Sequence, residues 1–386
     1  MRDWTEQVRI GQQEMRGDQS QRPGQVRVGI VAIPEATIGT LSGIYDVLSG
    51  LAMLAGREGV PDRSPFHIEI LGETPEPVRL ASGITLPVNG AATGVASDIV
   101  IVPSVLVPLE GWQRGRHPRL AEWLIARHAA GATLCSACSG IFLIAETGLF
   151  DGIEASVHWP YARAFSALYP SVRIAPDRAL VVSGARGELV SSGASASWHD
   201  LVLYLIGREA GPAAAQAVAK FFALQRHADG LAPFIVFDPP RDHGDALVAA
   251  AQEWLDTHAA VACPVREAAR RSGLSERGFA RRFRAATGHA VLDYVQRLRI
   301  EQAKRRLERT DEAVEEVSWH VGYEDPAAFR RLFRRITGLT PGAYRRQFAV
   351  PTGVLPACRS HTASQAAPLS SRSGHESGNP RLQAPG

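Results

Sequence analysis

Two stretches of the chain each place a glycine between two short helical patterns, and this repeated unit constrains the fold more than any other feature. The first stretch covers residues 264–288 and turns at Gly273, and the second covers residues 314–346 and turns at Gly322. Glycine has no Cβ and accepts the positive φ that a tight turn between helices needs. Each unit also repeats a phenylalanine pair four residues apart, which would anchor its second helix in a core. The pairs are Phe279 with Phe283 and Phe329 with Phe333.

Local signals support the second helix of each unit. Ser275 and Asp325 stand where they would cap these helices, and Pro326 follows at the first helical position. A long amphipathic pattern over residues 291–309 joins the two units. We therefore expect an all-α C-terminal domain with two helix-turn-helix units on one connector.

The charge of the chain is concentrated in this region. The net charge is only +3, but residues 261–348 hold 19 Lys and Arg against 11 Asp and Glu, a net of about +8. The remainder is then about −5. A basic segment joined to a mildly acidic body indicates a polyanionic partner for that segment alone. Two such units on a rigid connector could meet successive major grooves on one face of DNA, ~34 Å apart.

The C-terminal region resembles the AraC/XylS family of regulators over about 100 residues. The resemblance rests on GLSERGFARRFRAATG (273–288), LRIEQAKRRL (298–307) and VSWHVGYEDPAAFRRLFRRITGLTPGAYRR (317–346). By the family pattern, base readers would lie at Arg277, Ala280 and Arg281, and again at Ala327, Arg330 and Arg331. Arg284 and Arg334 complete the expected DNA-binding set. The alternative is that these arginines form a solvated helix face.

The N-terminal region alternates strand-like and helix-like patterns. Short apolar runs occur at residues 26–33, 66–71, 99–102, 132–135, 180–183 and 189–192. Helical patterns cover residues 41–55, 120–130, 140–148, 197–207 and about 212–228. This alternation predicts a flavodoxin-like α/β domain, a mostly parallel sheet with helices on both faces.

These patterns divide the chain into five parts. We expect a disordered leader (1–24), the α/β domain (25–230), a proline-containing linker (231–245), the DNA-binding domain (246–348) and a disordered tail (349–386). The leader lacks the apolar centre of a signal peptide, and no run of about 18 uncharged apolar residues occurs, so a cytoplasmic protein is expected. The four cysteines are too scattered for a disulfide framework, and a zinc site at Cys135 and Cys138 would lack further ligands. We expect no metal and no cofactor.

Within the N-terminal region, the segment TLCSACSGIFLIAETG (133–148) is the strongest candidate for a reactive or ligand-binding site. A strand meets a helix across small residues, and Cys138 stands at the junction, followed by Ser139. A nucleophile elbow has this construction of strand, strained turn and helix. Alternatives are an unreactive residue in a ligand pocket, a packed elbow without function, and a redox pair with Cys135.

Together with ASVHW (155–159) and SGASASWHDLVLYL (192–205), this segment resembles the ThiJ/PfpI superfamily, which has a class I glutamine-amidotransferase-like fold. The two-domain order is similar to that of the GlxA-type branch of AraC regulators. The resemblance implies that Cys138 takes the nucleophile position and His158 the partner position. The superfamily's usual acid falls on Thr40 here, because Glu35 comes too early and Asp46 too late. The thiol would then lack its usual proton partner, so we do not expect an enzyme.

The resemblance implies a sequence-specific transcription regulator. A small molecule, by analogy a nitrogen-containing metabolite, would bind near Cys138, Ser139, His158 and Thr40 and change the pairing of the α/β domains in a homodimer. RNA polymerase would be a further partner of an activator, and no membrane is involved. The alternative is a cysteine-dependent enzyme of the amidase, hydratase or glyoxalase type fused to a DNA-binding module. A third hypothesis is an oxidation sensor at Cys138.

Overall fold

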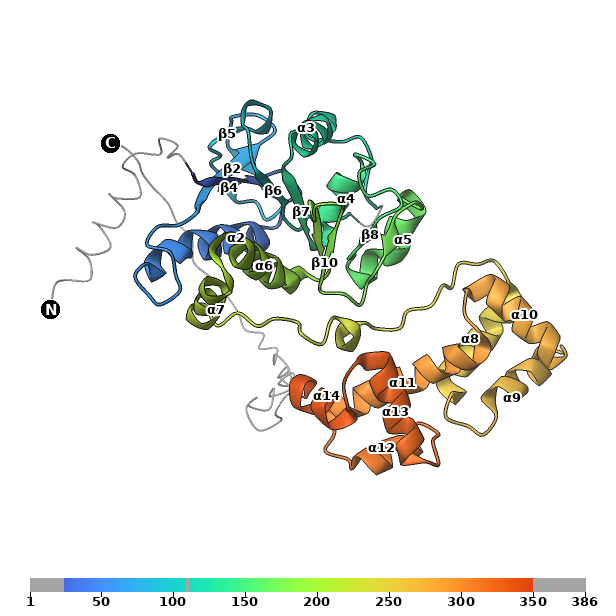
Figure 1. Cartoon of the computed structure of the whole chain (residues 1–386). Helices are drawn as coiled ribbons and strands as arrows, with labels where there is room; N and C mark the ends of the chain where they lie inside the picture. The colour runs from blue at the N-terminus through green and yellow to red at the C-terminus, as the bar shows by residue number, and fades with distance from the viewer. Residues whose placement is uncertain (1–23, 109–110, 350–386) are drawn as a thin grey trace, which may run out of the picture.

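A computed structural model describes residues 24–108 and 111–349, which form an α/β unit followed by a helical unit (Figure 1). The expected leader (1–24) and tail (349–386) lie outside the described residues, apart from residues 24 and 349. Within the described part of the chain, no helix combines the length and the apolar character that crossing a bilayer requires.

A seven-stranded sheet forms the centre of the α/β unit, in the order β10-β11-β7-β6-β1-β2-β5. Its strands are β1 (Val26–Val31), β2 (Phe66–Gly72), β5 (Gly90–Ala91), β6 (Ile99–Val102), β7 (Thr133–Ala137), β10 (Leu180–Ser183) and β11 (Leu189–Ser192). Within this sheet, all strand pairs are parallel except β10 with β11. Every residue of β6 is buried, as expected for a strand covered on both faces. The prediction of a mostly parallel sheet is thus confirmed.

The strand at residues 180–183 was predicted, but its antiparallel direction and the shortest strands were not. Only the residues 184–188 separate β10 from β11, and a connection this short joins antiparallel strands, whereas a parallel pair needs a crossover. Two small ribbons lie outside the main sheet: β3 (Val78–Arg79) with β4 (Thr85–Leu86), and β8 (Glu154–Ala155) with β9 (Arg173–Ile174). Strands of two residues carry no periodicity that sequence reasoning could find.

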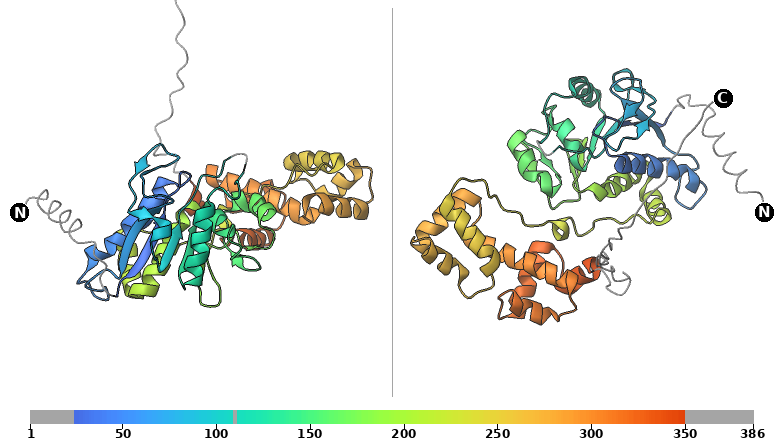
Figure 2. Two further views of the ribbon diagram at one scale, coloured as in Figure 1. Left: turned by 90° about the horizontal axis from the view of Figure 1, so that it is seen from above. Right: turned by 180° about the vertical axis from the view of Figure 1, so that it is seen from behind.

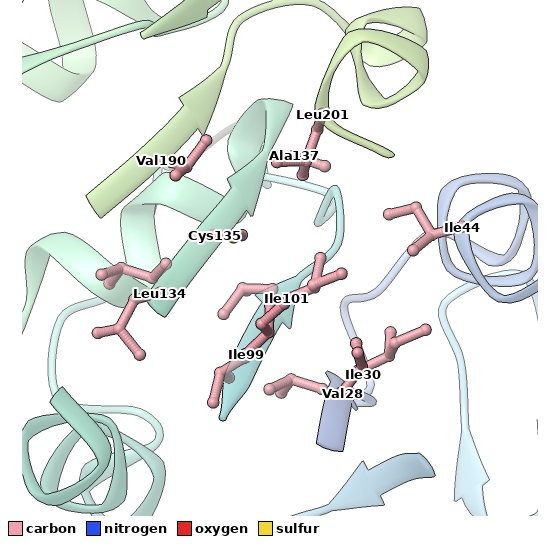
Figure 3. Packing of buried hydrophobic residues seen from close by; sticks show 14 of the residues in the cluster. Val28, Ile30, Ile44, Ile99, Ile101, Leu134, Cys135, Ala137, Val190 and Leu201 are labelled. Atoms are coloured by element: carbon pink, nitrogen blue, oxygen red, sulfur yellow. The ribbon is translucent and has the colours of Figure 1, made fainter. Parts of the chain in front are cut away.

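Helices cover both faces of the sheet, as the two views in Figure 2 show. Helices α2 (Ile38–Gly50), α6 (Trp198–Ala210) and α7 (Pro212–Phe221) pack together on one face. Helices α3 (Pro118–Ala129), α4 (Ile141–Ala145) and α5 (Ala162–Leu168) lie on the other. Figure 3 shows side chains from β1, β6, β7 and β11 meeting Ile44 of α2 and Leu201 of α6 in the core.

Two predicted helices are shorter than expected. The pattern over 140–148 forms α4 only to Ala145, since a turn follows and Gly148 has a φ of +73°. The pattern over 212–228 ends as α7 at Phe221. The following residues instead form an extended connection to the helical unit, which includes the 3-10 helix η6 (Ala232–Phe234).

Seven helices form the helical unit. They are α8 (Ala246–His258), α9 (Pro264–Arg271), α10 (Glu276–Thr287), α11 (Val291–Arg309), α12 (Val314–His320), α13 (Pro326–Thr337) and α14 (Pro341–Phe348). The predicted connector is α11, with the predicted bounds. It contributes Tyr294 to a core around Phe279 and Phe283, and Ile300 and other residues to a second core around Phe329 and Phe333. The unit therefore has two cores joined by one helix of 19 residues.

Candidate DNA-binding surface and cysteine site

The turns of the two helix-turn-helix units have the predicted geometry. Gly273 and Gly322 have φ values of +65° and +87°. The Ser275 side chain accepts a hydrogen bond from the Gly278 N–H at the start of α10. The Asp325 carboxylate accepts one from the Ala327 N–H at the start of α13. These caps satisfy backbone donors that a helix leaves unpaired and so set where each second helix begins.

Both second helices turn their phenylalanine pair inward and a polar face outward. Phe279, Phe283, Phe329 and Phe333 are all fully buried. The residues expected to contact DNA are all exposed: Arg277, Ala280, Arg281 and Arg284 on α10, and Ala327, Arg330, Arg331 and Arg334 on α13. In each set the spacing of three, four and seven residues from the first member places all four on one helix face. The two sets occupy equivalent positions, fifty residues apart.

Other arginines of the region have structural roles, which separates them from the outward faces. Arg282 forms an ion pair with Asp245 at 2.7 Å, where Asp245 caps α8. Arg306 forms an ion pair with Glu312 at 2.6 Å. Arg271 lies over the ring of Trp254. The positive charge of residues 261–348 is therefore divided between packing roles and the two outward faces.

The two outward faces differ in their ion pairing. Arg330 is paired with Glu315 of α12, and Arg331 lies 3.7 Å from the carboxylate of Asp325. Within the described residues, Arg277, Arg281, Arg284 and Arg334 have no carboxylate within ion-pairing distance. Exposed pairs contribute about 0–1 kcal/mol, so a phosphate could displace either carboxylate.

Arg299 of α11 joins the segment between α8 and α9 to the turn of the second helix-turn-helix unit. Its guanidinium donates to the carbonyl oxygens of Ala259 (2.7 Å) and Val261 (3.2 Å), after α8, and to that of Gly322 (2.9 Å) in the second turn. It also lies over the ring of Tyr323, 5.0 Å from its centroid. Sequence reasoning missed this role, because its partners are 23 to 40 residues away.

The elbow predicted at Cys138 is confirmed. Strand β7 ends at Ala137, Cys138 has a φ of +51°, and the chain continues through a 3-10 turn into α4. A positive φ is uncommon for a residue with a side chain and indicates local strain. Gly140 is needed because a Cβ there would collide with the carbonyl oxygens of Val102 and Pro103, at the end of β6.

The thiol of Cys138 meets side chains from two other loops. Its sulfur lies 3.4 Å from His158 Nδ1 and 3.6 Å from Ser195 Oγ. Cys138 is 2% exposed, whereas Ser195, in the loop after β11, is exposed. Burial lowers the pKa of His158, so its imidazole is neutral near pH 7 and one ring nitrogen can accept a proton. Sequence reasoning named the segment that holds Ser195 but did not single out this residue.

Ser139 and Thr40 have partners of their own in the structure. The Ser139 hydroxyl accepts a hydrogen bond from the Val105 N–H at 2.9 Å. Thr40 donates to the Ser104 hydroxyl at 3.1 Å. Both side chains therefore contact the loop that follows β6, and neither lies among the hydrogen-bond partners of the Cys138 sulfur.

Glu35 is buried next to a different histidine. Its carboxylate lies 3.2 Å from His117 Nε2 and 2.8 Å from an Arg116 guanidinium nitrogen, and His117 Nδ1 lies 3.1 Å from Glu73. Burial opposes ionisation of Glu35, but hydrogen bonds from His117 and the backbone, together with the positive charges of His117 and Arg116, outweigh burial and lower the pKa of this carboxyl. No local sequence pattern predicts this cluster, because its members lie on three separate loops.

Cys135 lies in the core of the sheet. It is fully buried, and burial raises the pKa of its thiol to about 12. Cys135, Cys138 and the exposed Cys263 are all free thiols. A thiol with this pKa is not ionised near neutral pH, which disfavours the redox-pair hypothesis because exchange requires a thiolate.

Known proteins resemble both units. A family model described as a helix-turn-helix domain matches residues 268–347. The HTH-type transcriptional regulator CdhR of Pseudomonas aeruginosa is 28% identical over 288 residues, 72% of this chain and 80% of CdhR. The HTH-type transcriptional regulator GlxA of Rhizobium meliloti is 27% identical over 208 residues, 53% of this chain and 62% of GlxA. A crystal structure of a ThiJ/PfpI family protein from Pseudomonas syringae aligns with 60% of this chain and 86% of its own, at 16% identity and a TM-score of 0.41.

The likeness to CdhR extends over both units, because 288 aligned residues exceed the length of either one. These curated relatives are transcriptional regulators. Two glycine-hinged helix pairs with exposed arginines belong to the helical unit, and a cysteine elbow belongs to the α/β unit. The chain is therefore similar over both units to helix-turn-helix transcriptional regulators, and its helical unit contains the matched helix-turn-helix domain.

Proposed function

We propose that this regulator reads a specific DNA sequence with α10 and α13 and responds to a small molecule bound at Cys138. In this proposal residues 25–230 form the sensor domain, 231–245 the linker and 246–348 the DNA-binding domain. The observation that carries the proposal is the strained elbow at Cys138, beside His158 and Ser195, in the same chain as the two exposed arginine faces.

The base-reading residues of the proposal are Arg277, Ala280 and Arg281 on α10 and Ala327, Arg330 and Arg331 on α13. Arginine can pair bidentately with guanine in the major groove, and an exposed alanine can contact a thymine methyl group. Arg284 and Arg334, one turn further along each helix, are assigned to phosphates. Footprinting across the genome, followed by competition with point-mutated operators, tests the assignment. Arg281→Ala should relax the base preference at one operator position and leave the others unchanged, and an unaltered preference contradicts it.

The effector site is proposed to take a small polar metabolite. Cys138, His158 and Ser195 offer hydrogen-bond donors and acceptors, and the lowered pKa of His158 keeps this imidazole uncharged. Ser139 and Thr40 belong to the proposed lining through the loop after β6, which both contact. Calorimetry of the full chain against fractionated metabolite pools tests the site. A binder should be lost in Ser195→Leu, which places a larger apolar side chain beside the thiol, and retained in Cys263→Ser, a thiol control outside the site.

Partners other than DNA complete the proposal. A homodimer formed through the α/β domains would place two DNA-binding domains on one operator, and an activator would in addition contact RNA polymerase. Analytical ultracentrifugation of the full chain, with and without duplex DNA, measures the oligomeric state. A monomer on DNA at micromolar concentration would contradict the dimer.

One observation favours a second candidate function, that of a cysteine-dependent enzyme. The Cys138 sulfur lies 3.4 Å from a neutral histidine, which is the arrangement of a nucleophile and its base. The hypothesis predicts turnover of an amide or aldehyde that Cys138→Ala abolishes. The oxidation-sensor hypothesis predicts instead that peroxide changes DNA affinity in the wild type and not in Cys138→Ser.

A further inference from the structure

The connection between the two units is ordered and packed at the α/β end. Leu231 is fully buried, and its N–H donates to the Asp177 carbonyl oxygen at 2.7 Å. A Cβ added to Gly193 would lie 2.6 Å from Leu231 Cδ1 and 2.5 Å from Ser156 Oγ. Leu231, Gly193 and Ser156 therefore meet at one tightly packed point.

This packed point adjoins the Cys138 site. Gly193 precedes Ser195 by two residues in the loop after β11, and Ser156 precedes His158 by two residues. Ser195 and His158 are the two hydrogen-bond partners of the Cys138 sulfur. A ligand that moves either loop must therefore move or strain the packing of Leu231, because close-packed interiors do not absorb such shifts.

The same connection is bound to the second helix-turn-helix unit a few residues later. The ring of Phe234 packs edge-on against Phe348 of α14, with centroids 5.1 Å apart. The Lys304 ammonium of α11 donates to the Ile235 carbonyl oxygen at 2.6 Å and pairs with Glu301 at 2.8 Å. Lys304 is only 4% exposed, and a buried ammonium is costly unless its donors are satisfied. The Ile235 carbonyl oxygen therefore takes the place of a water molecule as a hydrogen-bond acceptor for this ammonium group.

The connection next contacts α8 and α11, in the core that also holds Phe279 and Phe283 of the first helix-turn-helix unit. Phe237 packs against Tyr294, with ring centroids 5.2 Å apart, and Arg297 lies over the same phenylalanine ring. The Pro240 carbonyl accepts a hydrogen bond from the buried Gln252 side chain at 3.0 Å. In Figure 1 this segment runs along the helical unit between α7 and α8. A pocket of about 380 Å³ lies between residues 233–236 and helices α11 and α14.

We infer that residues 231–240 form a strap that couples the Cys138 site to both helix-turn-helix units. Displacement of the loops that hold His158 and Ser195 shifts Leu231, and the shift alters the contacts of Phe234 and Ile235 with α11 and α14. Coupling between two sites is reciprocal, so DNA bound to α10 and α13 must in turn alter the loop at Ser195. The inference rests on the proposed function only for its physiological trigger, a ligand at Cys138.

Hydrogen exchange on the full chain tests the strap without a ligand. The probe is a 30-base-pair duplex of random sequence at low ionic strength, with saturation checked by fluorescence anisotropy. The amides to follow are those of Gly193, bonded to Ala179, and Leu231, bonded to Asp177. We expect DNA to slow their exchange at least about fivefold in the wild type, the lower end of ordinary allosteric coupling.

Two variants give the decisive comparison. Phe234→Ala removes the contact with Phe348 and should reduce the effect of DNA at Gly193 to less than about twofold, while the duplex remains saturating. Val236→Ala alters an exposed neighbour and should behave as the wild type. Unchanged exchange at Gly193 in the wild type, or equal slowing in Phe234→Ala, overturns the strap. Neither result bears on whether a metabolite binds at Cys138, which calorimetry decides separately.

Discussion

The arginine faces make a quantitative prediction about the salt dependence of DNA binding. The observed association constant falls with salt with a slope of about −0.9 for each phosphate that a protein cation neutralises. Four outward arginines, Arg277, Arg281, Arg284 and Arg334, have no ion-pair partner among the described residues. If all four stand against phosphates, the slope is about −3.6, and affinity falls about 150-fold between about 50 and 200 mM salt.

The ion pairs on α13 decide whether the slope is steeper. If Arg330 and Arg331 leave Glu315 and Asp325 for phosphates, the number of neutralised phosphates rises to six and the slope to about −5.4. Glu315→Gln then leaves the slope unchanged. If both pairs persist on DNA, the slope stays near −3.6, and Glu315→Gln increases its magnitude by about 0.9.

Fluorescence anisotropy of a labelled 30-base-pair duplex, titrated with the full chain at several KCl concentrations, measures the slope. Arg284→Ala, which removes a proposed phosphate contact, should lower its magnitude by about 0.9, so that the same salt change costs about 40-fold instead of about 150-fold. Arg119→Ala, which removes an exposed arginine of α3, is the matched control and should not change the slope. A wild-type slope near zero, or an equal change in both variants, would refute the reasoning that these guanidinium groups meet the phosphate backbone.

Three other perturbations test the packing and the titration of the chain. Phe283→Ala empties a fully buried site and should lower the free energy of unfolding of the helical unit by about 3–5 kcal/mol in urea titrations, with loss of DNA binding. Gly140→Ala drives a Cβ onto carbonyl oxygens at the end of β6, so calorimetry should show the α/β unit destabilised by about 1–3 kcal/mol. Burial lowers the pKa of His117, but hydrogen bonds with Glu35 and Glu73 outweigh it and raise that pKa above the ordinary 6.5. The stabilisation is therefore complete below pH 6.5 and lost as the pH rises through the raised value, and His117→Gln should flatten the urea stability profile above pH 6.5.

The helical unit was the more predictable part because its signals are local. The glycine turns, the caps Ser275 and Asp325, and the phenylalanine pairs are all read within a few residues of where they act. The connector α11 has its predicted bounds for the same reason. What remained hidden was the pairing of Arg299 with carbonyl groups on two other segments, since sequence spacing does not record which loops the fold brings together.

The α/β domain shows the same division between local and distant information. The elbow at Cys138 could be predicted from small residues between a strand and a helix, and its positive φ confirms the strain. The approach of Ser195 depends on β11 lying beside β7 in the sheet, and strand order is not encoded in any single segment. The contact of Lys304 with the strap could not be predicted from the sequence either. A lysine on a basic helix is expected to be exposed to solvent, and only the structure shows that this one is buried.

The three hydrogen bonds of Arg299 have a consequence for the operators this regulator can use. The guanidinium binds carbonyl groups of the segment before α9 and of the turn before α13. The two helices proposed to contact bases, α10 and α13, therefore cannot rotate independently of each other. Inserting a single base pair between the two recognition boxes would rotate one box by about 34° around the duplex, out of register with its helix. Natural operators of this protein should therefore tolerate a change in the bases between the two boxes far better than a change in the number of base pairs that separates the boxes.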